Sequence, residues 1–85
     1  MTEPEAVLES LLQFIRRKLP GLTISGATDI EGDLPFDSLD RMELFGMIEK
    51  AYAVVIEPDA YLGRRLKILG NLAAFIAEHQ AAKRS

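Results

Sequence analysis

The sequence contains no cysteine and a single histidine, His79, which stands near its C-terminal end. Without cysteine, the chain has no disulfide, no thiolate metal site and no cysteine nucleophile. The one histidine has no partner histidine at the spacing of metal ligands, so we expect no metal site in the protein alone. Because most catalytic sites need at least a base and a group that orients it, these absences argue against a self-contained enzyme.

Long apolar runs are also absent. No stretch approaches the about 20 consecutive apolar residues that a membrane-spanning helix needs. The N-terminal segment reads MTEPEAVLESLLQF and is acidic, where a secretory signal would be basic and then apolar. We therefore expect a soluble, cytoplasmic protein with no membrane span. Its length of 85 residues predicts one small domain over 1–85.

The net charge of −3 is unevenly distributed along the chain. Residues 28–59 hold nine acidic residues against Arg41 and Lys50, a sum of −7, whereas residues 60–85 sum to +4. An acidic segment of this kind either attracts a basic partner or is an ordinary solvated face. Nucleic acid is a poor partner for it, since the bases of the C-terminal third have no aromatic stacking platform beside them. These bases are Arg64, Arg65, Lys67, Lys83 and Arg84.

Apolar spacing predicts an all-α protein, a four-helix bundle with three main helices and one short helix. The first helix should span 3–18, with Thr2 and Glu5 as a capping box and Pro20-Gly21 as its end. Its buried face should consist of Leu8, Leu11, Leu12, Ile15 and Leu19. A long loop over 20–36 should follow, held on the core by Leu22, Ile24, Ile30, Leu34 and Phe36.

The second helix should span 38–52 and bury Leu44, Phe45, Ile48, Ala51 and Tyr52. Leu39, Met42 and Met47 should point outward, where either a third helix covers them or a partner protein contacts them. A short helix capped by Asp59 should cover 60–66. The last helix should span 69–80, with Leu69, Leu72, Ala73 and Ile76 inward, Phe75 beside them and a frayed tail after it.

The stretch PFDSLDRMEL around Ser38 supports two interpretations. In the first, it is a helix N-terminus with Asp37 or Ser38 as the N-cap, where Asp40 and Glu43 favour the positive end of the helix dipole. In the second, the Ser38 hydroxyl is an attachment point. A helix N-terminus stabilises a phosphate through its free N–H groups and its dipole.

The stretch GDLPFDSLDRMELFGMIEKAYAVVIEPD resembles the acyl carrier proteins, whose hallmark is Asp-Ser-Leu-Asp, a hydrophobic residue and then Glu-Leu. The discrete, type II members are the closest in plan, with Asp33-Leu34 before the motif and AAFIAEHQA as a closing helix. The resemblance implies a carrier without catalytic activity. A phosphopantetheinyl transferase would attach 4'-phosphopantetheine covalently to Ser38, with Asp37 assisting, and cargo would ride on its thiol as a thioester.

The resemblance also implies roles for two groups of side chains. Partner enzymes with basic docking surfaces, which load and process acyl chains, would contact the helix through Leu39, Asp40, Met42, Glu43 and Glu49. Six apolar residues would line a pocket for the attached chain, or are simply core: Leu44, Phe45, Ile48, Tyr52, Ile56 and Leu66. The carrier would be a monomer in fatty-acid-like, polyketide or other specialised biosynthesis.

Several positions depart from the family pattern. Pro35 stands where the family has glycine, Arg41 and Lys50 dilute the acidity of the helix, and Gly46 replaces a larger residue. We interpret these as features of a specialised carrier. Two alternatives remain, namely an aminoacyl or D-alanyl carrier and an unmodified helical interaction module.

Overall fold

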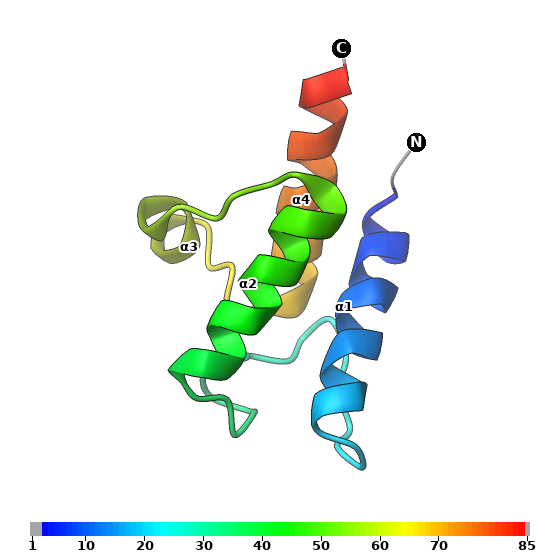
Figure 1. Ribbon diagram of the computed structural model, residues 1–85, viewed down its shortest axis with the longest axis vertical. Coiled ribbons are helices and arrows are strands. Elements are labelled where there is room, and N and C mark those ends of the chain that lie inside the picture. The colour runs from blue at the N-terminus through cyan, green and yellow to red at the C-terminus, as the bar shows by residue number, and fades with distance from the viewer. Residues whose placement is uncertain (1–2, 85) are drawn as a thin grey trace.

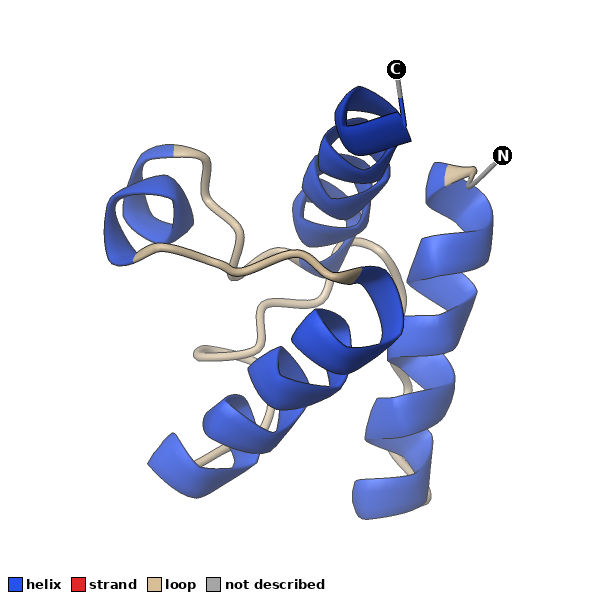
Figure 2. Cartoon of the chain, turned by 45° about the horizontal axis from the view of Figure 1, so that its top comes forward, coloured by secondary structure: helices blue, strands red, loops and turns tan. Residues whose placement is uncertain are grey.

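The computed structural model describes residues 3–84, and the side chains of residues 3–80. It contains four helices, α1 (Pro4–Lys18), α2 (Ser38–Tyr52), α3 (Pro58–Gly63) and α4 (Leu69–Arg84). Figure 1 shows α1, α2 and α4 gathered together and the short α3 standing to one side, and Figure 2 shows the loops that join them. Within 3–84 the only β pairing is an isolated bridge between Asp29 and Ile68. The predicted all-α fold is confirmed.

Both ends of α2, the end of α1 at Lys18 and the start of α4 at Leu69 match the prediction, and the other helix ends differ. The N-cap of α1 is Glu3, which makes no side-chain capping bond, and the predicted cap Thr2 lies outside the described residues. The prediction that Asp59 caps a helix over 60–66 was wrong, because α3 begins two residues earlier, at Pro58 with Glu57 as its N-cap, and ends at Gly63. Proline suits a first helical position, where its missing N–H is not needed.

The end predicted for α4 was also wrong. The helix continues past Gln80 to Arg84, so the predicted frayed tail is helical over 81–84. Residues 81 and 82 are both alanine, the residue with the highest helix propensity, and this favours continuation of the helix. None of the helices within residues 3–84 is long and apolar enough to cross a membrane.

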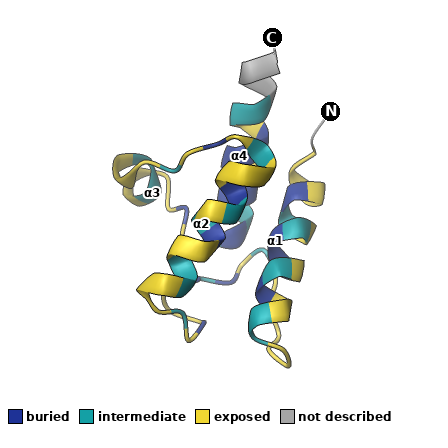
Figure 3. Cartoon of the chain, viewed as in Figure 1, coloured by how far each residue is buried: buried dark blue, intermediate teal, exposed yellow. Residues whose placement is uncertain are grey.

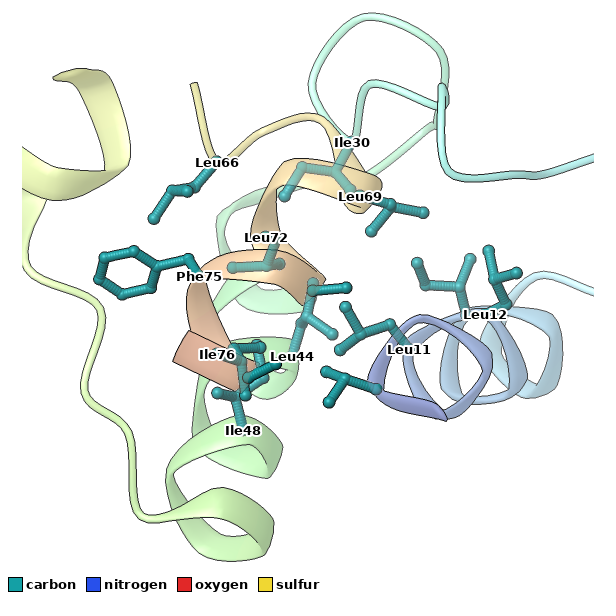
Figure 4. Close-up of a cluster of buried hydrophobic side chains, with 14 of the residues drawn as sticks. Leu11, Leu12, Ile30, Leu44, Ile48, Leu66, Leu69, Leu72, Phe75 and Ile76 are labelled. Atoms are coloured by element: carbon teal, nitrogen blue, oxygen red, sulfur yellow. The ribbon is translucent and has the colours of Figure 1, made fainter. Parts of the chain in front are cut away.

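The core is formed where α1, α2 and α4 meet. Figure 4 shows Leu11 of α1, Leu44 and Ile48 of α2, and Leu72 and Ile76 of α4 converging on one another. All five of these side chains have no exposed surface. On α1, the fully buried positions include Val7, which the sequence analysis had omitted, whereas the predicted Leu8 and Leu19 are only half-buried.

The long loop is fixed to the segment before α4. Ile24, Ile30 and Leu34 are buried as predicted, Phe36 is half-buried, and Leu22 is exposed, contrary to the prediction. Three backbone hydrogen bonds tie this loop to the start of α4: Ile30 N to Lys67 O at 2.9 Å, Leu69 N to Thr28 O at 3.0 Å, and Gly70 N to Gly26 O at 2.7 Å. These bonds fix the position of the loop that leads to the N-terminus of α2.

The outer side of α2 is exposed along its length (Figure 3). Leu39 is 62% exposed and Met42 is 68% exposed, so no third helix covers them. Met47 is half-buried against the core, contrary to its predicted outward position. The predicted burial of Ala51 was wrong, because it lines an open pocket between α1 and α2 together with Phe14.

Candidate functional site

The N-terminus of α2 is closed by two aspartates. Asp37 is the N-cap, and its Oδ1 accepts a hydrogen bond from Asp40 N at 2.8 Å. Asp40 Oδ2 in turn accepts from Asp37 N at 3.2 Å, which completes a capping box. Such a box satisfies two backbone donors that a helix start otherwise leaves open. Of the two caps that the sequence allowed, the structure uses Asp37.

Ser38 is the first residue of α2, and its side chain is exposed. Among the described residues, nothing hydrogen bonds to its hydroxyl, because Asp37 does the capping. The first N–H groups of a helix have no partner within the helix, and together with the helix dipole they stabilise a nearby anion. The chemistry of this position therefore fits an attached phosphate group.

The residues predicted to contact partner enzymes lie along this helix, and we call them the docking face: Leu39, Asp40, Met42, Glu43 and Glu49. All are exposed except Asp40, which is half-buried in the capping box. Gly46 leaves open space on α2, since a Cβ added there would meet nothing within 4 Å. The exposed apolar side chains are thus Leu39 and Met42, with carboxylates around them.

Lys18, the last residue of α1, pairs with two of these carboxylates. Its Nζ lies 2.7 Å from Glu43 Oε2 and 3.7 Å from Asp40 Oδ1. The hydrogen bond to Glu43 raises the pKa of Lys18, while partial desolvation opposes the shift. Lys18 therefore remains protonated at neutral pH. No local pattern in the sequence predicts this pairing, because Lys18 lies on α1, far in the chain from Asp40 and Glu43 on α2.

The six residues predicted to line an acyl pocket fall into two groups. Leu44, Ile48 and Leu66 are at most 1% exposed and belong to the core, whereas Phe45, Tyr52 and Ile56 are half-buried. An open pocket of about 420 Å³ lies between α2 and α3, and we call it the α2–α3 pocket. It is lined by Glu31, Arg41, Phe45, Ile56, Pro58, Tyr61 and Leu62. Two of the six residues, Phe45 and Ile56, line this pocket.

Polar groups from three segments meet at this pocket. Glu31 accepts a hydrogen bond from the Tyr61 hydroxyl and lies 3.5 Å from Arg41 Nη1. The ring of Tyr61 packs edge-on against that of Phe45 at 5.6 Å between centroids. Partial burial, and next the bond to Glu31, raise the pKa of Tyr61. The loop, α2 and α3 are therefore joined through one cluster.

Ser38 lies on the same side of α2 as this pocket. Arg41 and Phe45 follow Ser38 by three and seven residues, spacings that place all three on one face of a helix. Glu43 and Met47 line another open pocket, beside Phe14 of α1. They follow Ser38 by five and nine residues, spacings that place them on the opposite face of the helix from Ser38. A group attached to Ser38 would therefore have the α2–α3 pocket along its own face of the helix.

A family model for the phosphopantetheine attachment site matches residues 5–76. The chain belongs to this family. No curated protein and no solved structure matches the chain. Members of the phosphopantetheine attachment family are carrier domains that interact with a phosphopantetheinyl transferase and with biosynthetic enzymes, and 4'-phosphopantetheine is attached covalently, typically to a serine. The N-terminus of α2 in this carrier domain, with Asp37 and Ser38, lies inside the matched range.

Proposed function

We propose that the protein is an acyl carrier protein that holds its phosphopantetheine arm on Ser38. The observation that carries the proposal is the exposed Ser38 hydroxyl, which has no partner among the described residues and stands at the first position of α2. The matched range contains two other serines. Ser10 lies within α1, and Ser25 Oγ already accepts a hydrogen bond from Ala27 N at 3.2 Å. Neither follows an aspartate at a helix start.

Asp37 serves two purposes in this proposal. One of its oxygens, Oδ1, holds the helix start in place through Asp40 N. Its Oδ2 accepts no hydrogen bond from the described residues and is free to help position a divalent cation while the transferase acts. In that transfer, Ser38 Oγ bonds to the pyrophosphate phosphorus of coenzyme A that bears the pantetheine. The P–O–P bridge breaks on that side, adenosine 3',5'-bisphosphate leaves, and the serine proton passes to the transferase or to solvent.

The rest of the molecule supplies two surfaces for the loaded carrier. The thiol of the arm holds the acyl group as a thioester. The apolar side chains of the α2–α3 pocket, Phe45 and Ile56 among them, shield part of an attached chain from water. The docking face contacts successive enzymes of a fatty-acid-like, polyketide or other specialised pathway. We propose that the protein does this as a cytoplasmic monomer.

The test is the intact mass of the protein after incubation with coenzyme A, Mg²⁺ and a broad-specificity phosphopantetheinyl transferase. The wild type should gain one phosphopantetheine, Ser38→Ala should gain none, and the matched control Ser25→Ala should gain one. A gain that survives in Ser38→Ala would place the attachment elsewhere. No gain in a folded protein, with two different transferases, would favour an unmodified interaction module.

A second step tests the cargo. Holo protein is offered acyl groups by a ketosynthase system and amino acids by adenylating enzymes, and the thioester that forms is identified by mass. Acyl loading supports the proposal, whereas exclusive aminoacyl loading would identify an aminoacyl carrier.

A further inference from the structure

Lys18 is held at the edge of the docking face by several interactions at once. Its Nζ contacts Glu43 and Asp40, and it lies 5.9 Å from the centroid of the Phe14 ring. Lys18 also ends α1, where the dipole of the helix favours a positive charge. The side chain of Lys18 is 23% exposed and that of Asp40 is 25% exposed, whereas that of Glu43 is 47% exposed. Three side-chain contacts and the helix dipole therefore hold this half-buried cation at the edge of the docking face.

This cation changes the electrostatics of the docking face. The face carries the carboxylates of Asp40, Glu43 and Glu49, a charge of −3. Lys18 pairs with the first two, and Lys50 adds a second positive charge near the pocket beside Phe14. The local sum is therefore −1. The acidic character expected from the sequence is largely neutralised from within the molecule.

The apolar part of the face is untouched by this pairing. Leu39 and Met42 are 62% and 68% exposed, and they are the two large apolar side chains of α2 that are exposed. Exposed apolar side chains lose unfavourable hydration when a partner covers them, and salt does not screen this contribution as it screens an ion pair. A partner that covers Leu39 and Met42 gains this contribution whether or not Lys18 stays in place.

We propose that Lys18 acts as an internal competitor for the basic groups of partner enzymes, and that this carrier selects partners that dock mainly through apolar contact with Leu39 and Met42. The inference rests on the proposed function, because it assumes that α2 is the surface that enzymes contact. A partner with a strongly basic rim must displace Lys18 from Glu43 before it can form its own ion pair. The competitor is intramolecular, so its effective concentration is high and does not fall on dilution.

The test uses a broad-specificity phosphopantetheinyl transferase with a basic docking surface as the probe partner. We compare Lys18→Gln with Arg16→Gln, which removes the same charge two residues earlier, where Arg16 pairs with Glu9 on α1 itself. Lys18→Gln should lower KM for the carrier about threefold at low salt, the size expected for one exposed ion pair. The difference should disappear in about 1 M salt. Arg16→Gln should change KM less, and Lys18→Arg should behave as the wild type.

The apolar part is tested separately in the same assay. Met42→Ala should raise KM more than Glu43→Gln does, since Glu43 is already paired. Circular dichroism and thermal unfolding confirm that each variant is folded. The inference is overturned if Lys18→Gln and Arg16→Gln give equal KM values, or if Glu43→Gln has the larger effect. In either of these cases the wild type would still gain one phosphopantetheine on Ser38. Absence of any mass gain would instead contradict the proposed function.

Discussion

Asp37 and Asp40 hydrogen bond to each other's backbone across the first turn of α2, at 2.8 Å and 3.2 Å. Each carboxylate satisfies the N–H of the other residue, so the helix start needs nothing from the serine between them. This is why Ser38 can present its hydroxyl to solvent without loss of helix stability. The motif Asp-Ser-Leu-Asp therefore separates the structural task from the chemical one.

Substitutions of Asp37 can separate its role as the N-cap of α2 from its proposed role in positioning a cation. Asp37→Ala removes the cap and should lower the free energy of unfolding by about 1 kcal/mol, whereas Asp37→Asn keeps a capping oxygen and should change it little. Urea unfolding measures both. If the Asp37 carboxylate also positions the cation during transfer, then Asp37→Asn should be modified more slowly than the wild type at nearly equal stability. Equal destabilisation by both variants would contradict the capping role.

Gly26 and Gly70 pack against each other where the long loop meets α4. A Cβ on Gly70 would lie 3.0 Å from Gly26 O, which accepts the hydrogen bond from Gly70 N at 2.7 Å. Gly70→Ala should therefore push the loop away and destabilise the fold by about 1–3 kcal/mol, as overpacking does. Gly46→Ala is the matched control, since its Cβ meets nothing within 4 Å in the middle of α2. It should stabilise by about 0.5–1 kcal/mol. Thermal unfolding shifts of the same sign for both variants would contradict this contact.

The sequence predicted best what local rules determine. The bounds of α2 follow from an acidic cap and a sustained helical period, and the inward face of α4 follows from the spacing of Leu69, Leu72 and Ile76. Short-range patterns do not predict which side chains on the edge of a helix face are buried, because that depends on how the helices pack. Ala51 has the right helical phase for burial, yet it is exposed and lines the open pocket beside Phe14.

The candidate site was predictable in part for the same reason. Ser38 and Asp37 lie within one short motif, so their position at a helix N-terminus could be derived from the sequence. The pairing of Lys18 with Glu43 and the cluster of Glu31 with Tyr61 join residues 25 and 30 positions apart. No local pattern encodes such contacts, because they depend on how the helices pack.

The Tyr61 hydroxyl gives a titration that reports on the α2–α3 pocket. Its pKa is raised above the ordinary value of about 10, first by burial and then by Glu31. The neutral form is thus favoured in the folded state, so this contribution to stability is present below pH about 10 and is lost as the pH rises through the folded pKa. The phenolate absorbance measures it in a Tyr52→Phe background, where Tyr61 is the only tyrosine.

Two variants in that background shift the pKa of Tyr61 in opposite directions. Glu31→Gln should lower it toward the ordinary value without reaching it, since burial remains. Arg41→Gln should raise it, because the Arg41 charge favours the phenolate. Shifts of the same sign would show that these side chains do not meet at Tyr61 as the structure describes.

The α2–α3 pocket predicts where an attached chain lies. When the transferase loads Ser38 with an octanoyl arm, hydrogen exchange in α3 should be slower than with an acetyl arm, because the longer chain packs between α2 and α3. The reporters are the amides of Tyr61 and Arg64, which bond to Glu57 O and Ala60 O, each at 2.9 Å. Slower exchange reflects a lower population of the locally opened state.

The variant Ile56→Asn should remove this difference, because it places an amide among the apolar groups that line the pocket. Leu22→Asn, a change of the same kind at an exposed loop position, should leave the difference intact. A chain that enters the core beside Leu44, Ile48 and Leu66 would instead slow exchange mainly in α2 and α4. That result would favour a site for the chain within the core and exclude the α2–α3 pocket, since a chain of eight carbons cannot occupy both sites at once.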